Sequence, residues 1–189
     1  MFKIVHLHAK NLSARIILKK GLTRVIGMFK LGDYVVNSTN GVCKIEEIQS
    51  LNLTGENKDY YLLIPPDDIS ARTFVPVDRA QGRIRPVMDK DHAMELIGQV
   101  KALDEVYVEI EKQRDLAYKQ AVNSNSPQKL ASVYKTTYRR KQGRNIAGKK
   151  PNSVDERYLK KAEDLLYNEL CFVLQLSKKE VAELLLTNI

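Results

Sequence analysis

The chain has little cysteine and no tryptophan. Its two cysteines, Cys43 and Cys171, are far apart, with no C-x-x-C pair and no histidine cluster beside either of them. This spacing excludes a disulfide framework and a zinc site of the usual kind, and it indicates a reducing cytoplasm. The sequence also has no run of about 18 apolar residues, which excludes a membrane-spanning helix.

Motifs that carry common enzyme chemistry are missing as well. The sequence contains no P-loop, dinucleotide-binding glycine loop, nucleophile elbow or zincin motif. His6 and His8 offer two metal ligands without a third, and Asp67 and Asp68 occupy a turn. We therefore expect no enzyme activity, no cofactor and no bound metal.

Positive charge is concentrated in two parts of the chain. The net charge is +8, and residues 1–27 carry +6 with no acidic residue. Residues 123–161 carry +9, whereas the helical sequence on each side of them carries −3. Clustered lysine and arginine of this kind favour a polyanionic partner such as nucleic acid.

Residues 28–77 have the pattern of short strands separated by turns. Runs rich in Val, Ile, Leu and Tyr alternate with clusters of Gly, Asn, Asp and Pro. The predicted strands cover residues 34–36, 42–53, 60–64 and 73–77. Four or five strands in fifty residues predict a curled sheet of Tudor or SH3-like size, whose open edge can accept a strand from a partner.

Beyond Pro86 the apolar residues recur with a helical period. One predicted helix face runs from Ala93 to Leu103, and a weaker one continues from Leu103 to Ala121. The next helix begins with Ser126 as N-cap and ends near residues 139–141, with Leu130, Tyr134 and Tyr138 facing inward.

The last part of the chain predicts a long helix and a short one. Ser153 and Glu156 have the spacing of a capping box, and an apolar stripe follows from Leu159 to Val173. A closing helix is expected over 177–186. The predicted fold class is therefore α+β, with a small Tudor/SH3-like β-barrel module followed by an all-α bundle of about five helices.

A basic run lies in the middle of the helical part. Residues 135–150 contain seven cations and no acidic residue, with Tyr134 and Tyr138 interleaved at its start. Such a run suits the phosphates of a nucleic acid, although an ordinary solvated helix end also favours lysine and arginine. The spacing of the two tyrosines favours core positions over base stacking.

Two blocks of sequence carry a family resemblance. The first consists of Met28-Phe-Lys-Leu-Gly-Asp33 with Val35, Val36 and Gly41, then Phe74-Val-Pro-Val77 and Arg85-Pro-Val87. The second consists of Ser153-x-x-Glu-Arg157, Leu159, Ala162, Leu166 and Glu169-Leu170. Together they resemble the CarD/CdnL family of bacterial RNA polymerase-binding transcription regulators, whose first module is similar to the polymerase-interacting domain of transcription-repair coupling factors.

The resemblance implies a division into parts. We expect a β-rich polymerase-interacting domain over 28–88 and a helical DNA-binding domain over 89–189. Residues 1–27 form a basic leader, for which an upstream extension before a true start at Met28, a DNA-attracting arm and a membrane-surface helix are open interpretations. We favour the first because the family fold begins at Met28, and we expect the leader to be disordered or poorly packed.

The resemblance also implies a function. The first module would bind the RNA polymerase β subunit, and the helical domain would bind promoter DNA at the upstream edge of the melted bubble and modulate open-complex stability and initiation. The implied polymerase-binding residues are Leu51, Leu53, Phe74, Val75 and Pro76. The predicted DNA-binding residues are Arg114, Lys135, Arg139, Arg140, Lys141, Arg144, Lys149, Lys150 and Arg157.

Two departures from the family stand out. Family members often have arginine at the positions of Leu51 and Phe74, and they commonly use a helical-domain tryptophan as a wedge at the bubble edge. Glu111 aligns with that tryptophan, and Tyr107 or Tyr118 would replace it only in a shifted helix. We expect a cytoplasmic monomer that associates with the nucleoid through polymerase; the alternatives are a dimeric sequence-specific repressor that does not contact polymerase, and an RNA-binding adaptor.

Overall fold

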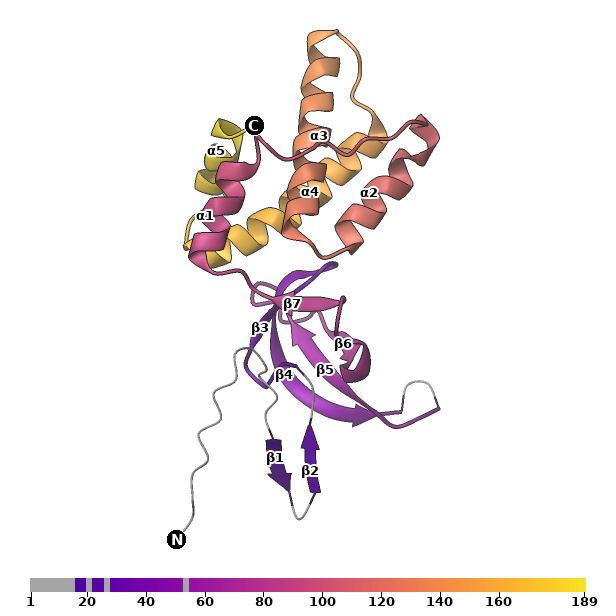
Figure 1. Ribbon diagram of the computed structural model, residues 1–189, viewed down its shortest axis with the longest axis vertical. Coiled ribbons are helices and arrows are strands. Elements are labelled where there is room, and N and C mark those ends of the chain that lie inside the picture. Colours follow the sequence, from indigo (N-terminus) through magenta and orange to yellow (C-terminus); the bar gives the residue numbers. More distant parts are fainter. Residues whose placement is uncertain (1–15, 20–21, 26–27, 53–54) are drawn as a thin grey trace.

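The computed structural model describes residues 16–19, 22–25, 28–52 and 55–189. Figure 1 shows a β-sheet region joined to a helical region that lies beyond one end of the sheet. The architecture is α+β, as predicted from the sequence. Within the described residues, no helix is both long and apolar enough to cross a bilayer.

The main sheet is antiparallel and has the strand order β6-β5-β4-β3-β7. Its strands are β3 (Tyr34–Asn37), β4 (Gly41–Leu51), β5 (Lys58–Ile64), β6 (Thr73–Pro76) and β7 (Ile84–Pro86). The four predicted strands are confirmed, whereas β7 was not predicted as a strand. In the described part of the chain, β6 and β7 are the two edges, and closure into a Tudor-like barrel remains a prediction.

One face of the sheet buries a small apolar core. Val35, Ile45, Tyr61 and Leu63 are all fully buried there. Tyr61 and Leu63 share one face of β5, as expected for alternate residues of a strand, and Tyr60 and Leu62 on the other face are also buried. Phe29 covers the same core, and its backbone N–H donates to the Tyr61 hydroxyl at 3.3 Å.

A second, two-stranded sheet lies in the basic leader. Strands β1 (Ile16–Lys19) and β2 (Leu22–Val25) pair antiparallel, with Ile16 opposite Val25. The leader was expected to be disordered or poorly packed; these eight residues form a paired ladder and are not disordered, and poor packing remains a prediction. The rest of the leader lies outside the described residues.

The helical region contains five α-helices around one apolar core. They are α1 (Lys90–Gln99), α2 (Arg114–Asn123), α3 (Pro127–Ile146), α4 (Ser153–Leu174) and α5 (Lys178–Thr187), with a short 3-10 turn, η2 (Glu111–Gln113), before α2. The predicted stripes supply the core: Ala93, Val100, Leu166 and Leu170 are all buried within it. Helix α4 contacts α1, α2, α3 and α5, so it is the central element.

Several helix boundaries differ from the prediction. The weak stripe from Leu103 does not form a helix until Arg114, because the preceding residues run as an irregular segment. Helix α3 continues to Ile146 and so carries the end of the basic run on a regular helix.

The caps differ from the prediction at one helix and agree at another. The N-cap of α4 is Asn152, whose Oδ1 accepts from the N–H groups of Val154 and Asp155, so the predicted cap at Ser153 is wrong by one residue. Ser126 caps α3 as predicted, with its hydroxyl accepting from the Lys129 N–H.

Helix α4 packs against the turn between β3 and β4. Asn168 Oδ1 accepts from the Val42 N–H at 2.7 Å, and the Tyr34 and Phe172 rings lie 4.9 Å apart. Gly41 has a φ of +73°, and a Cβ at this position would lie 2.4 Å from Asn168 Oδ1. The contact therefore requires glycine both for its backbone conformation and for close approach.

We expect Gly41→Ala to lower the free energy of unfolding by about 2–4 kcal/mol, because it combines left-handed backbone strain with displacement of Asn168 from a buried N–H. Gly32→Ala is the matched control: Gly32 has a φ of +84° but no atom within 4 Å of the added Cβ. That control should lose only about 1–2 kcal/mol. Urea unfolding measures both variants, and equal losses would contradict a tight contact between Gly41 and α4.

Candidate functional site

Strand β6 is an edge of the sheet and carries most of the predicted polymerase-binding residues. The strand register puts Phe74 and Pro76 on the same face as Leu51, and Val75 on the opposite face. Phe74 is 38% exposed, whereas Val75 is 3% exposed and belongs to the core. A partner at this edge would therefore meet Phe74, Pro76 and the strand backbone, and Leu53 lies outside the described residues.

A buried ion pair joins the sheet to the helices. The Arg85 guanidinium, on β7, donates from Nη1 to Glu169 Oε1 at 2.6 Å and from Nη2 to Oε2 at 2.5 Å. The Glu169 side chain, on α4, is 1% exposed, and its Oε1 also accepts from the Met88 N–H at 3.1 Å. Such a two-pronged pair fixes direction as well as distance.

The turn between α2 and α3 reinforces this junction. Asn125 has a φ of +56°, and its Nδ2 donates to the Val36 carbonyl of β3 at 3.1 Å. The Asn125 carbonyl in turn accepts from Arg85 Nε at 2.8 Å. Two strands of the sheet are thus tied to both α4 and the start of α3.

The predicted DNA-binding cations divide into buried ones, ones paired with carboxylates, and ones without a carboxylate partner among the described residues. Lys135 is 3% exposed, and its Nζ donates to the carbonyls of Lys101 and Leu103 at 2.7 and 2.6 Å. Arg114 is equally buried. Lys135 holds the irregular segment against α3, and Arg114 lies between Glu111 of η2 and Asp155 of α4, so both charges are engaged within the fold.

Three further cations of the predicted set are engaged by carboxylates. Arg139 pairs with Glu105 at 2.9 Å and also donates to the C-terminal Ile189 carbonyl. Arg157 pairs with Asp115, and Arg140 pairs with Asp155 at 3.1 Å. From the sequence alone these three arginines would be expected to be free to bind DNA. In the fold, each of them is paired with a carboxylate of the same chain.

The remaining four cations lie at the end of α3 and in the following loop. Lys141, Arg144, Lys149 and Lys150 have no carboxylate within ion-pair distance among the described residues. Arg144 Nε donates to the Lys150 carbonyl at 2.6 Å, which holds the loop against the helix. Lys141 acts only at longer range on Glu163, partly offsetting the rise that burial causes in the pKa of that carboxyl. We name these four residues the tip cations.

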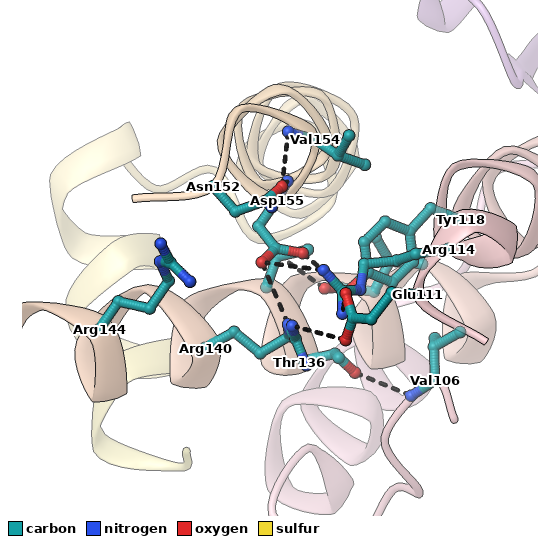
Figure 2. Close-up of polar contacts among 12 residues, drawn as sticks. Val106, Glu111, Arg114, Tyr118, Thr136, Arg140, Arg144, Asn152, Val154 and Asp155 are labelled. Atoms are coloured by element: carbon teal, nitrogen blue, oxygen red, sulfur yellow. Dashed lines mark hydrogen bonds and ion pairs between the residues drawn. The ribbon is translucent and has the colours of Figure 1, made fainter. Parts of the chain in front are cut away.

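Two arginines and two carboxylates meet beside the first turn of α4 (Figure 2). Asp155 is 2% exposed and accepts from Arg140 Nε and from the Tyr118 hydroxyl, which lies 3.2 Å away. Arg114 Nη1 lies 3.8 Å from the same carboxylate. Burial, together with the Asp155 charge, raises the pKa of Tyr118, so its hydroxyl remains a donor.

Aromatic residues near this cluster differ sharply in exposure. Tyr118 and Tyr134 are fully buried, and Tyr138 is partly buried, so Tyr134 and Tyr138 belong to the core as predicted. Tyr107 is 83% exposed on the irregular segment, beside Ile110 at 51%. Of the two tyrosines considered as replacements for a wedge tryptophan, only Tyr107 reaches the surface.

The described residues contain no group of three or more His, Cys, Asp or Glu side chains arranged to hold a metal ion.

Comparison with protein families assigns the first module. Residues 29–88 match the family described as the CarD-like/TRCF RID domain. Residues 29–88 are thus similar to this domain, and we refer to them as the RID domain. The match includes β3 to β7 and ends just before α1, so it covers the sheet and the β7 arginine of the junction. RID domains interact with RNA polymerase, which indicates a transcription-related role for the chain.

Sequence reasoning missed the residues that connect the RID domain to the helices. Asn125, Asn168 and Asp155 had no predicted role, and Arg85 and Glu169 appeared only as matches to family positions. One feature of the sequence did point to a buried pair. Glu169 lies within the apolar stripe of α4, where a charge without a partner would be costly. Its partner is 84 residues away in the sequence and cannot be identified from spacing.

Proposed function

We propose that the chain binds the RNA polymerase β subunit through the RID domain and promoter DNA through the helical region, near the upstream edge of the bubble, and so modulates open-complex stability. The observation that carries this proposal is the family match over residues 29–88. The same action would speed initiation where melting limits the rate and slow it where promoter escape limits.

The β6 edge is the proposed polymerase contact. An edge strand presents backbone N–H and C=O groups that a partner strand can pair with, and side chains on alternate positions then add specificity. Phe74 is the largest exposed apolar side chain on this strand, and Leu51 lies on the same face. Buried aromatic anchors of this kind dominate the binding energy of many interfaces.

The tip cations are the proposed DNA contact. None of them forms an ion pair with a carboxylate of the described residues. They lie at the end of α3 and in the following loop, and Figure 1 shows that this end of α3 points away from the sheet. Lysine and arginine contacts to phosphates position a protein on DNA and carry little sequence information. We therefore expect binding that is salt-dependent and weakly selective for sequence.

Tyr107 is the residue we propose at the bubble edge. Its ring is exposed on the irregular segment just before η2, which begins with Glu111, the residue that the resemblance places at the position of the family tryptophan. An exposed aromatic ring can stack on an unpaired base, with roughly 1–3 kcal/mol per stacked base in single-strand binding proteins. Glu111 itself lacks an aromatic surface and is paired with arginines.

We expect Phe74→Ala to weaken binding to RNA polymerase about tenfold, because truncating an interface aromatic typically removes more than about 1 kcal/mol. Leu186→Ala is the matched control, since Leu186 is exposed to a similar degree but lies on α5. Interferometry with immobilised polymerase would measure both, and equal affinities would contradict docking at the β6 edge. DNA binding should be unchanged in both variants.

The triple variant Lys141→Gln, Lys149→Gln and Lys150→Gln should bind duplex DNA more weakly at every sequence tested. The slope of log affinity against log salt should fall by roughly 0.9 for each phosphate that the variant no longer binds. A control triple, Lys90→Gln, Lys178→Gln and Lys179→Gln, removes the same charge from exposed sites on α1 and α5. Fluorescence anisotropy at several salt concentrations distinguishes them, and equal weakening in both triples would remove the tip from the proposal.

A further inference from the structure

Glu111 bridges the two arginines that flank Asp155. Its Oε1 lies 3.4 Å from Arg140 Nη2, and its Oε2 is in contact with Arg114 Nη2. Figure 2 shows the guanidinium groups between the Glu111 carboxylate and the Asp155 carboxylate. Within the described residues, the cluster is thus electrically neutral, with two cations and two anions.

The two carboxylates are held very differently. Asp155 is 2% exposed, in the first turn of α4, and is fixed by Arg140 and the Tyr118 hydroxyl. Glu111 is 69% exposed and lies in η2, at the end of the irregular segment. The Glu111–Arg140 pair is exposed on both sides, and such a pair typically contributes less than about 1 kcal/mol to stability. Glu111 is therefore the carboxylate that another anion can replace.

Arg114 shows that the site is incompletely satisfied. Its side chain is 4% exposed, yet Nε has no hydrogen-bond acceptor among the described residues, and Nη2 faces Glu111 without hydrogen-bond geometry. Buried donors are nearly always paired in native proteins, and leaving one unpaired is costly. A phosphate presents several oxygens and can accept from two edges of a guanidinium, which a single side-chain carboxylate at this position does not do.

We propose that Arg114 and Arg140 form a phosphate-binding site that Glu111 occupies in the free protein, and that a backbone phosphate of DNA displaces this carboxylate. The inference rests on the DNA contact proposed above and extends it. Arg140 and Arg144 are one turn apart on α3, so the site continues the tip cations along the helix (Figure 2). Both guanidiniums keep anionic partners after the exchange. The phosphate takes the place of the Glu111 carboxylate, and the Asp155 carboxylate does not move.

This exchange makes Glu111 an internal competitor of DNA. In the free protein the carboxylate screens the two arginines, which lowers affinity for DNA that is not held nearby. When the RID domain holds the chain on polymerase, the local DNA concentration is high enough to compete. Glu111 would thereby direct DNA engagement toward polymerase-bound promoters.

Glu111→Gln tests the inference, with Glu109→Gln as its matched control. Glu109 is exposed two residues away and has no ion pair among the described residues, so both variants remove one negative charge from the same segment. Anisotropy with a labelled duplex of arbitrary sequence should show about three- to tenfold tighter binding for Glu111→Gln and less than about twofold for Glu109→Gln. The salt slope should steepen by up to about 0.9 only in Glu111→Gln.

Glu111→Asp provides a second variant at unchanged net charge. The shorter side chain cannot span both arginines, so binding should again tighten, which general electrostatics does not predict. If wild type binds DNA and all three variants bind equally, the inference fails and the proposed DNA contact stands. A lower melting temperature in Glu111→Gln without any change in slope would assign Glu111 a structural role and overturn the inference. If no form of the protein binds DNA, both proposals fail.

Discussion

The Glu169 carboxylate is the group on which the arrangement of the two regions depends. A charge that is 1% exposed is tolerated only when it is paired and hydrogen-bonded, and Arg85 and the Met88 N–H supply that pairing from the end of the sheet. The accepting carboxylate of Glu169 is fixed on α4, and the donors, Arg85 and the Met88 N–H, lie on β7 and just after it. The ion pair therefore sets the angle between the sheet and the helices. The Asn168 bond to Val42 adds a second fixed point at the neighbouring residue of α4.

This junction bears on the proposed function. The β6 edge and the tip cations lie on different elements, and a protein that stabilises a polymerase–DNA assembly gains most when its two contacts are held at a constant spacing. A flexible linker would allow both contacts but would make their joint binding depend on chain entropy. Here the connection from β7 to α1 is short and is fastened by the buried ion pair.

The sequence predicted more of the fold than of the site. Strand runs bounded by Gly, Asn and Pro clusters, and the helical stripes of α1 and α4, carry their own local signal, so they were found. Strand β7 has only three residues, one of them Pro86, and its pairing with β3 is a long-range contact. The segment before Arg114 has apolar spacing close to helical, but Thr136 and Lys135 of α3 bond its backbone instead.

The positions of lysine and arginine in the sequence were the poorest guide to which side chains could bind DNA. Seven cations in sixteen residues suggested one continuous strip, whereas the fold buries Lys135 and pairs Arg139 and Arg140 with acidic residues from distant positions. Their partners, Glu105 and Asp155, lie outside α3, so the sequence pattern gave no sign of the pairing. Only the tertiary structure shows which cations already have a partner within the fold.

The most direct test of the account is the lifetime of the polymerase–promoter open complex after challenge with a polyanionic competitor, with and without the protein, at two salt concentrations. If one chain holds polymerase and DNA together, the lifetime should increase, and the increase should shrink at the higher salt concentration. An unchanged lifetime under conditions where the protein is bound to polymerase would contradict the claim that it modulates open-complex stability.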